Sequence, residues 1–142
     1  MNPNRTYEEN MAALKKVLTQ RTYTALSHRN IEFVLKYQNA TTQELAAYLR
    51  RQQAELRHIP GRTEIIGGDF IELRFRGWVN ALEAIGVSRE LAAKRSTPAL
   101  ETTMLFQQEY ERQREQDILE KRQKKAANKE KMRQEKAERK AK

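Results

Sequence analysis

The sequence contains no cysteine and only two histidines among its 142 residues. Without thiols there can be no disulfide framework and no thiolate metal site, and two histidines do not make a zinc centre or a catalytic triad. No stretch approaches the roughly 18 apolar residues that a membrane span needs, and the segment from Met1 to Glu9 does not read as a signal peptide. We therefore expect a cytoplasmic protein with no metal, no cofactor and no membrane partner.

Glycine and proline are also scarce, with five and three residues. Apolar residues recur at helical spacing through most of the chain, and no alternating pattern of a strand is found. The predicted fold class is all-α. We expect a small helical domain with helix-turn-helix-like packing over residues 1–97, followed by a long charged helix or basic arm over residues 98–142.

Three helices are expected before residue 58. The first starts at a Thr6 cap, the second runs from Ser27 to Gln38, and the third starts at a Thr41 cap with Glu44 three residues later. The turn at Asn39 and Ala40 between the last two has helix-turn-helix spacing, although helical proteins that bind no nucleic acid often show it too. The apolar residues expected to face the core are Tyr7, Met11, Leu14 and Leu18, then Ile31, Val34 and Leu35, then Leu45, Tyr48, Leu49 and Leu56.

The segment from His58 to Val87 holds the glycines and the only tryptophan, and the rest of the chain is expected either to pack on it or to extend from it. Pro60 and Gly61 end the third helix, and Gly67 and Gly68 reverse the chain. A single helix is then predicted from Asp69 to Gly86, in which Gly77 permits a close helix contact or a kink. Its apolar stripe, expected at the centre of the core, consists of Ile71, Phe75, Trp78, Leu82 and Ile85.

Residues 41–87 resemble the homing-endonuclease-associated repeat, a small helical module found beside HNH-type nucleases and in proteins of mobile elements. The resemblance implies a DNA-binding role. One departure is the sequence Phe75-Arg76-Gly77-Trp78, because the family usually has Phe-Gly-Ser-Trp and therefore a small residue where this chain has a charge. The residues that carry the resemblance are Pro60, Arg62, Phe75, Trp78, Ala81, Leu82 and Gly86.

Polar residues beside this apolar stripe suit a surface that faces a nucleic-acid groove. Arginine binds phosphate or guanine edges with two hydrogen bonds, and asparagine pairs with adenine. The alternative is that Arg74 and Arg76 pair with Glu72 or another carboxylate and have no further role. The predicted nucleic-acid-binding residues of the domain are Arg50, Arg51, Arg57, Arg62, Arg74, Arg76 and Asn80.

Charge divides the C-terminal segment, which is expected to be helical from Pro98 onward. Residues 100–120 contain two basic and six acidic residues, whereas residues 121–142 contain eleven basic and three acidic residues. The apolar seam of a coiled coil is missing beyond Leu119, so this end is a solvated helix, a disordered arm or a polyanion-binding arm. Its predicted binding residues are Lys121, Arg122, Lys124, Lys125, Lys129, Lys131 and Arg133.

The formal net charge of +9 indicates that polyanions are attracted to the protein. The first hypothesis is an accessory or regulatory protein that binds nucleic acid, DNA in preference to RNA. The second is a protein-interaction factor, such as an inhibitor or accessory subunit of a mobile-element system or a ribosome-associated protein, that docks through the long C-terminal helix. An enzyme is not expected, because the sequence has no His-Asn-His arrangement, no carboxylate cluster at metal-ligand spacing and no phosphate loop.

Overall fold

The structure is a computed structural model that describes residue 4 and residues 6–141. The beginning of the predicted domain, at Met1, and the end of the predicted arm, at Lys142, lie outside these residues. Every regular element of the described chain is a helix, so the predicted all-α class is confirmed. The helices are α1 (Tyr7–Tyr37), α2 (Thr42–Leu56), η1 (Arg62–Glu64), α3 (Gly68–Phe75), α4 (Trp78–Ala84), α5 (Arg89–Lys94), η2 (Leu100–Thr102) and α6 (Met104–Ala141).

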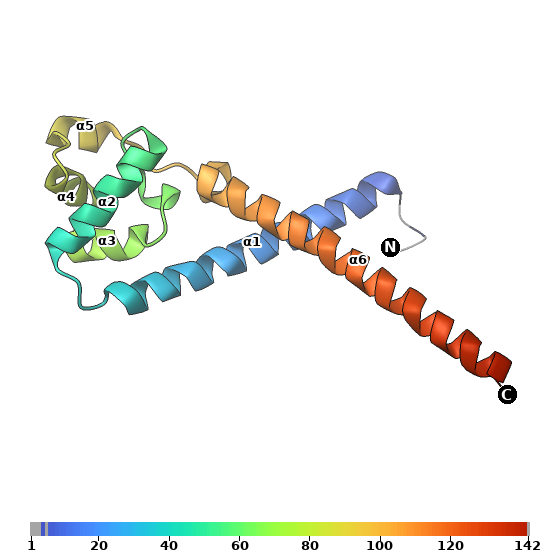
Figure 1. Cartoon of the computed structure of the whole chain (residues 1–142). Helices are drawn as coiled ribbons and strands as arrows, with labels where there is room; N and C mark the ends of the chain where they lie inside the picture. Colours follow the sequence, from blue (N-terminus) through green and yellow to red (C-terminus); the bar gives the residue numbers. More distant parts are fainter. Residues whose placement is uncertain (1–3, 5, 142) are drawn as a thin grey trace.

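The molecule has a helical head and two long helices that cross (Figure 1). Helices α2 to α5 form the head, and the C-terminal part of α1 packs against it. Helix α6 leaves the head, crosses α1 in the opposite chain direction, and continues beyond it to the C-terminal end. Ion pairs between Arg29 and Glu109, at 2.9 Å, and between Arg21 and Asp117, at 3.6 Å, join the two helices at the crossing. Among the described residues, no helix is both long and apolar enough to span a membrane.

Helix α1 is one continuous helix of 31 residues, so the prediction of two separate helices was wrong. Thr6 caps it as predicted, since its hydroxyl accepts a hydrogen bond from the Glu9 N–H at 3.2 Å. Hydroxyl residues in the middle of α1 do not start a new helix. The hydroxyls of Thr22 and Thr24 instead donate to the carbonyls four residues earlier, within the unbroken helix.

The buried face of α1 also differs from the prediction. Ile31, Val34 and Leu35 are exposed by 58%, 37% and 62%, and Tyr7 and Met11 are exposed as well. The buried side chains are Leu18, as predicted, and Thr22, Leu26 and Phe33. Because the helix is unbroken, the Leu18 side determines which later residues face inward, and at about 100° per residue this places Phe33 inside and Ile31 outside.

The start of α2 agrees with the prediction, and so do its buried residues. The Thr41 hydroxyl accepts a hydrogen bond from the Glu44 N–H at 3.1 Å, and both Leu45 and Leu49 are fully buried. These two leucines pack with Ile71 and Leu82 at the centre of the core of the head. The sequence therefore located the most buried part of this helix correctly.

The predicted helix from Asp69 to Gly86 is divided into α3 and α4, so its continuity was wrong. The break lies at Arg76 and Gly77, whose φ angles are 59° and 144°. Glycine adopts the second of these without strain. The Asn80 side-chain amide closes the break by donating to the carbonyls of Phe75, at 3.0 Å, and Arg76, at 3.2 Å. Gly77 thus separates two helices, where the sequence predicted a close contact or a kink within one helix.

Trp78 follows this break and lies in the core, as predicted. Its exposure is 9%, and its indole N–H donates to the carbonyl of Pro60 at 3.1 Å. The other predicted stripe residues divide between buried Ile71 and Leu82 and partly buried Phe75 and Ile85. The apolar stripe was therefore predicted correctly, although the backbone through it was not.

Helix α6 begins at Met104, six residues later than the predicted start at Pro98. The Thr103 hydroxyl accepts a hydrogen bond from the Phe106 N–H at 3.1 Å, so a threonine fixes this start. Pro98 lies in the preceding connection, where its carbonyl accepts a hydrogen bond from the Thr63 hydroxyl at 2.6 Å. At about 1.5 Å per residue, the 38 residues of α6 extend roughly 57 Å.

Candidate nucleic-acid interface

The C-terminal half of α6, from Lys121 to Ala141, carries the largest concentration of unpaired charge in the described chain. Every described side chain in this stretch is exposed. Lys121 forms an ion pair with Asp117 at 3.0 Å. The remaining basic side chains of the stretch make no ion pair or hydrogen bond with any described residue, and they are Arg122, Lys124, Lys125, Lys129, Lys131, Arg133, Lys136, Arg139 and Lys140.

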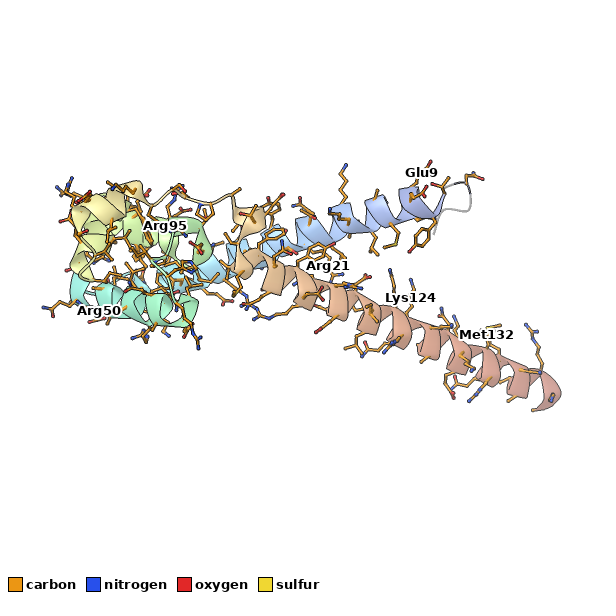
Figure 2. The ribbon with its side chains drawn as sticks, turned by 90° about the horizontal axis from the view of Figure 1, so that it is seen from above. Glu9, Arg21, Arg50, Arg95, Lys124 and Met132 are labelled. Atoms are coloured by element: carbon orange, nitrogen blue, oxygen red, sulfur yellow. The ribbon has the colours of Figure 1, made fainter. Side chains whose placement is uncertain are left out.

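This half of α6 projects away from the rest of the molecule, and we call residues 121–141 the basic arm. Both views show it extending past the crossing with α1 with no other element packed along it (Figures 1 and 2). Lys124 and Met132 mark it in Figure 2. Its positive charge is therefore open to an external anion along its whole length.

The first half of α6 has the opposite charge, and that charge is mostly neutralised by α1. Glu109 is 3% exposed and pairs with Arg29 at 2.9 Å and with Arg112 at 3.4 Å. Arg21 lies at the crossing in Figure 2 and pairs with both Asp117 and Glu120 at 3.6 Å. The acidic residues of α6 thus hold the two long helices together, a role that sequence spacing did not predict.

Three of the predicted binding residues in the head each make two internal polar contacts with their side chains. Arg74 donates to the carbonyls of Gln38 at 3.4 Å and Ala40 at 2.5 Å, and so holds the turn between α1 and α2. Arg62 pairs with two carboxylates near the start of α3, those of Asp69 at 3.5 Å and Glu72 at 3.2 Å. Asn80 closes the break between α3 and α4.

The other predicted arginines of the head are more accessible. Arg50 projects from the far end of the head in Figure 2, and it donates to the carbonyl of Ala84 at 3.1 Å. Arg51 lies 5.9 Å from the centre of the Tyr48 ring. Arg57 and Arg76 are exposed, and within the described chain their side chains have no ion pair or hydrogen bond. These two side chains are the freest cations among the predicted head residues.

Arg57 and Arg76 also share a backbone feature, because each ends a helix in the left-handed conformation. Their φ angles are 61° and 59°. Glycine and asparagine adopt this conformation more readily than arginine, and here the backbone N–H of each arginine bonds a carbonyl of the helix that it ends. Both residues were named from the sequence as binding candidates, but their left-handed backbone was not predicted.

A second polar cluster, which sequence reasoning missed, lies where the head meets the start of α6. The Glu64 carboxylate bonds to the Gly61 N–H at 2.9 Å, to His58 at 2.6 Å and to Arg95. Burial alone would raise the pKa of Glu64, but these hydrogen bonds and the charges of Arg95 and His58 hold that pKa below its usual value. The cluster borders an open groove lined also by Met104.

The cluster holds the segment that follows α5 and leads to α6 against the segment between α2 and α3. Arg95 also donates to the carbonyls of Ile59 at 2.8 Å and Ser96 at 3.2 Å, so all three of its guanidinium nitrogens have internal partners. In the part of the chain that the structure describes, no group of three or more histidine and carboxylate side chains is arranged to hold a metal ion.

Against known proteins, the chain matches no family model, no curated protein and no solved structure. The resemblance of residues 41–87 to the homing-endonuclease-associated repeat stays a prediction. The function proposed below is therefore inferred from the fold and the charges of the chain itself.

Proposed function

We propose that this protein binds nucleic acid, DNA in preference to RNA, as an accessory or regulatory factor. The observation that carries the proposal is the basic arm, whose cations are exposed and, apart from Lys121, unpaired among the described residues. Phosphate backbones are the commonest polyanions in a cell, and binding them releases counterions in proportion to the number of contacts. The arm therefore supplies affinity, and Arg57 and Arg76 supply additional contacts from the head.

Only some of the predicted residues take part in the proposed binding. Arg62, Arg74 and Asn80 hold backbone or carboxylate groups within the head. A side chain already bonded in this way must give up its internal partners to contact a phosphate. Arg57, Arg76 and the cations of the arm other than Lys121 have no such partners to give up, and we assign the binding to them.

The test is the affinity of the full chain and of a chain ending at Glu120 for duplex DNA, single-stranded DNA and structured RNA. The shortened chain keeps the ion pairs of Arg21 and Arg29 that join α1 to α6. We expect it to bind more than about 100-fold more weakly at about 0.15 M salt and with a flatter salt dependence, because it loses several phosphate contacts at once. Equal binding by the two chains would refute the role of the arm.

A second candidate function is docking to a protein, and exposed apolar residues favour it. Ile118 and Leu119 on α6 are 42% and 54% exposed, and Ile31 and Leu35 on α1 are also exposed. A complex formed through such residues would survive moderate salt, whereas phosphate binding would not. Replacing Ile118 and Leu119 with serine separates the two, because it weakens protein docking and leaves DNA binding unchanged.

A further inference from the structure

The cations of the basic arm are concentrated on one face of the helix. At about 100° per residue, eight of the ten basic side chains between residues 121 and 141 fall within a sector of about 120°. The acidic residues of the same stretch, Glu130, Glu135 and Glu138, lie outside that sector. We call this sector the basic face, and it consists of Lys121, Arg122, Lys125, Lys129, Arg133, Lys136, Arg139 and Lys140.

The basic face is turned away from α1. Nearer the crossing, the side of α6 that packs on α1 carries buried Phe106 and Glu109 and partly buried Gln113. Continued along the helix, that side carries the two basic residues that the basic face excludes, Lys124 and Lys131. The basic face thus meets solvent with no other element in front of it.

The length and charge of the basic face suit a row of phosphates along a duplex. From Lys121 to Lys140 the helix rises about 28 Å. Each strand of a duplex carries a phosphate about every 3.4 Å along the axis, which gives about eight phosphates per strand over this length. Because the strands wind around the axis, a straight helix lying along the duplex meets the phosphates of either strand that lie on its side, and its eight cations outnumber or match them.

Two features of the basic arm indicate that it binds a duplex and not a single strand, and that it contacts the phosphate backbone and does not enter a groove. Proteins that bind single strands stack bases on aromatic side chains, and residues 121–142 contain no aromatic residue. A helix buried in the major groove has phosphates on both flanks, where the three glutamates outside the basic face would be repelled. Both features favour one-sided contact with the backbone of a duplex.

We infer that the basic face binds along the phosphate backbone of double-stranded nucleic acid, without reading its sequence. This inference rests on the proposed function and adds to it the substrate class and the side of the helix that makes contact. B-form DNA and A-form RNA both offer a continuous row of phosphates, so the experiment includes both.

The test compares two double variants of the full chain that lose the same charge. Lys125→Gln with Lys129→Gln removes two cations of the basic face, and Lys124→Gln with Lys131→Gln removes the two outside it. Glutamine has nearly the helix propensity of lysine, and circular dichroism checks that helix content is unchanged. The probes are a 20-base-pair DNA duplex, an RNA duplex of the same sequence and the DNA single strand.

We expect the basic-face variant to bind duplex roughly 30-fold more weakly at about 0.15 M salt, because each lost phosphate contact removes a factor of about five. Its slope of log K against log salt should be smaller by about 1.8, while the other variant stays close to the parent. Either duplex bound in this pattern supports the inference, and the tighter one identifies the source of the phosphates.

Three outcomes would overturn parts of the reasoning, and they can be told apart. Equal loss in the two variants would disprove a single binding face but leave nucleic-acid binding intact. Binding of the single strand as tightly as the duplex would disprove the duplex assignment. Failure of the parent chain to bind any of the three probes would remove the proposed function itself.

Discussion

Replacing Arg74 with alanine should destabilise the head, although sequence reasoning treated this arginine as a surface contact for nucleic acid. The substitution removes the hydrogen bonds to the carbonyls of Gln38 and Ala40 and the contact with the Phe70 ring, whose centre is 5.6 Å away. Hydrogen bonds that involve a charged group contribute about 1.5–3 kcal/mol each, and one of these two is long. We expect a loss of about 2 kcal/mol in the free energy of unfolding.

The matched control is Arg76→Ala, two residues later. Arg76 is exposed, and its side chain has no ion pair or hydrogen bond to a described residue, so its loss should change stability by less than about 0.5 kcal/mol. In thermal unfolding followed by circular dichroism, Arg74→Ala should lower Tm by about 4–8 °C and Arg76→Ala by about 1 °C. Equal Tm values for the two variants would refute the structural role of Arg74.

Other predictions concern the crossing, the polar cluster and the chain reversal. Arg29→Ala should lower the free energy of unfolding by about 1–2 kcal/mol, because it leaves buried Glu109 with a weaker partner; unchanged urea denaturation would contradict this. Because the folded-state pKa of Glu64 is lowered, its ionised form stabilises the fold above its ordinary pKa of 4.5, and this stabilisation is lost as pH falls through the folded pKa. The stability difference between the parent and Glu64→Gln should therefore shrink on acidification, and a difference that grows would show the sign to be wrong. Gly67→Ala should cost at least about 2 kcal/mol more than Gly86→Ala, because both have positive φ but only the first would place a Cβ 2.3 Å from a phenylalanine ring; equal denaturation midpoints would count against that contact.

Local signals in the sequence were enough to predict most of the helix starts and the core of the head. Thr6 and Thr41 cap helices where the spacing of threonine and glutamate indicated. Leu45, Leu49 and Trp78 are buried as their periodicity predicted. These features depend on residues within one or two turns of each other, which a single sequence records directly.

Features that depend on tertiary contacts could not be predicted in the same way. The inward side of α1 near Phe33 follows from the continuity of a 31-residue helix and from its packing on α6, so an apolar triplet such as Ile31, Val34 and Leu35 misled the prediction. The hydrogen bond from the Asn80 amide to the Phe75 carbonyl closes the break at Gly77. The apolar spacing of Phe75 and Trp78 in the sequence fits a continuous helix equally well, so it gave no sign of this break.

Part of the candidate site could also be predicted from the sequence, because the basic arm is recognisable from its composition. The basic arm is a property of composition, so its residues could be named from the sequence and are exposed in the structure. The arginines of the head look alike in sequence, yet Arg74 bonds backbone carbonyls 34 and 36 residues away while Arg76 remains free. Only the folded arrangement separates them.

The decisive measurement is the salt dependence of binding of the full chain to duplex DNA. If the basic face contacts the backbone with half or more of its eight cations, the slope of log K against log salt should lie between about −4 and −7. A slope near −1, or no binding at low salt, would contradict the proposal that the exposed cations of this helix bind nucleic acid.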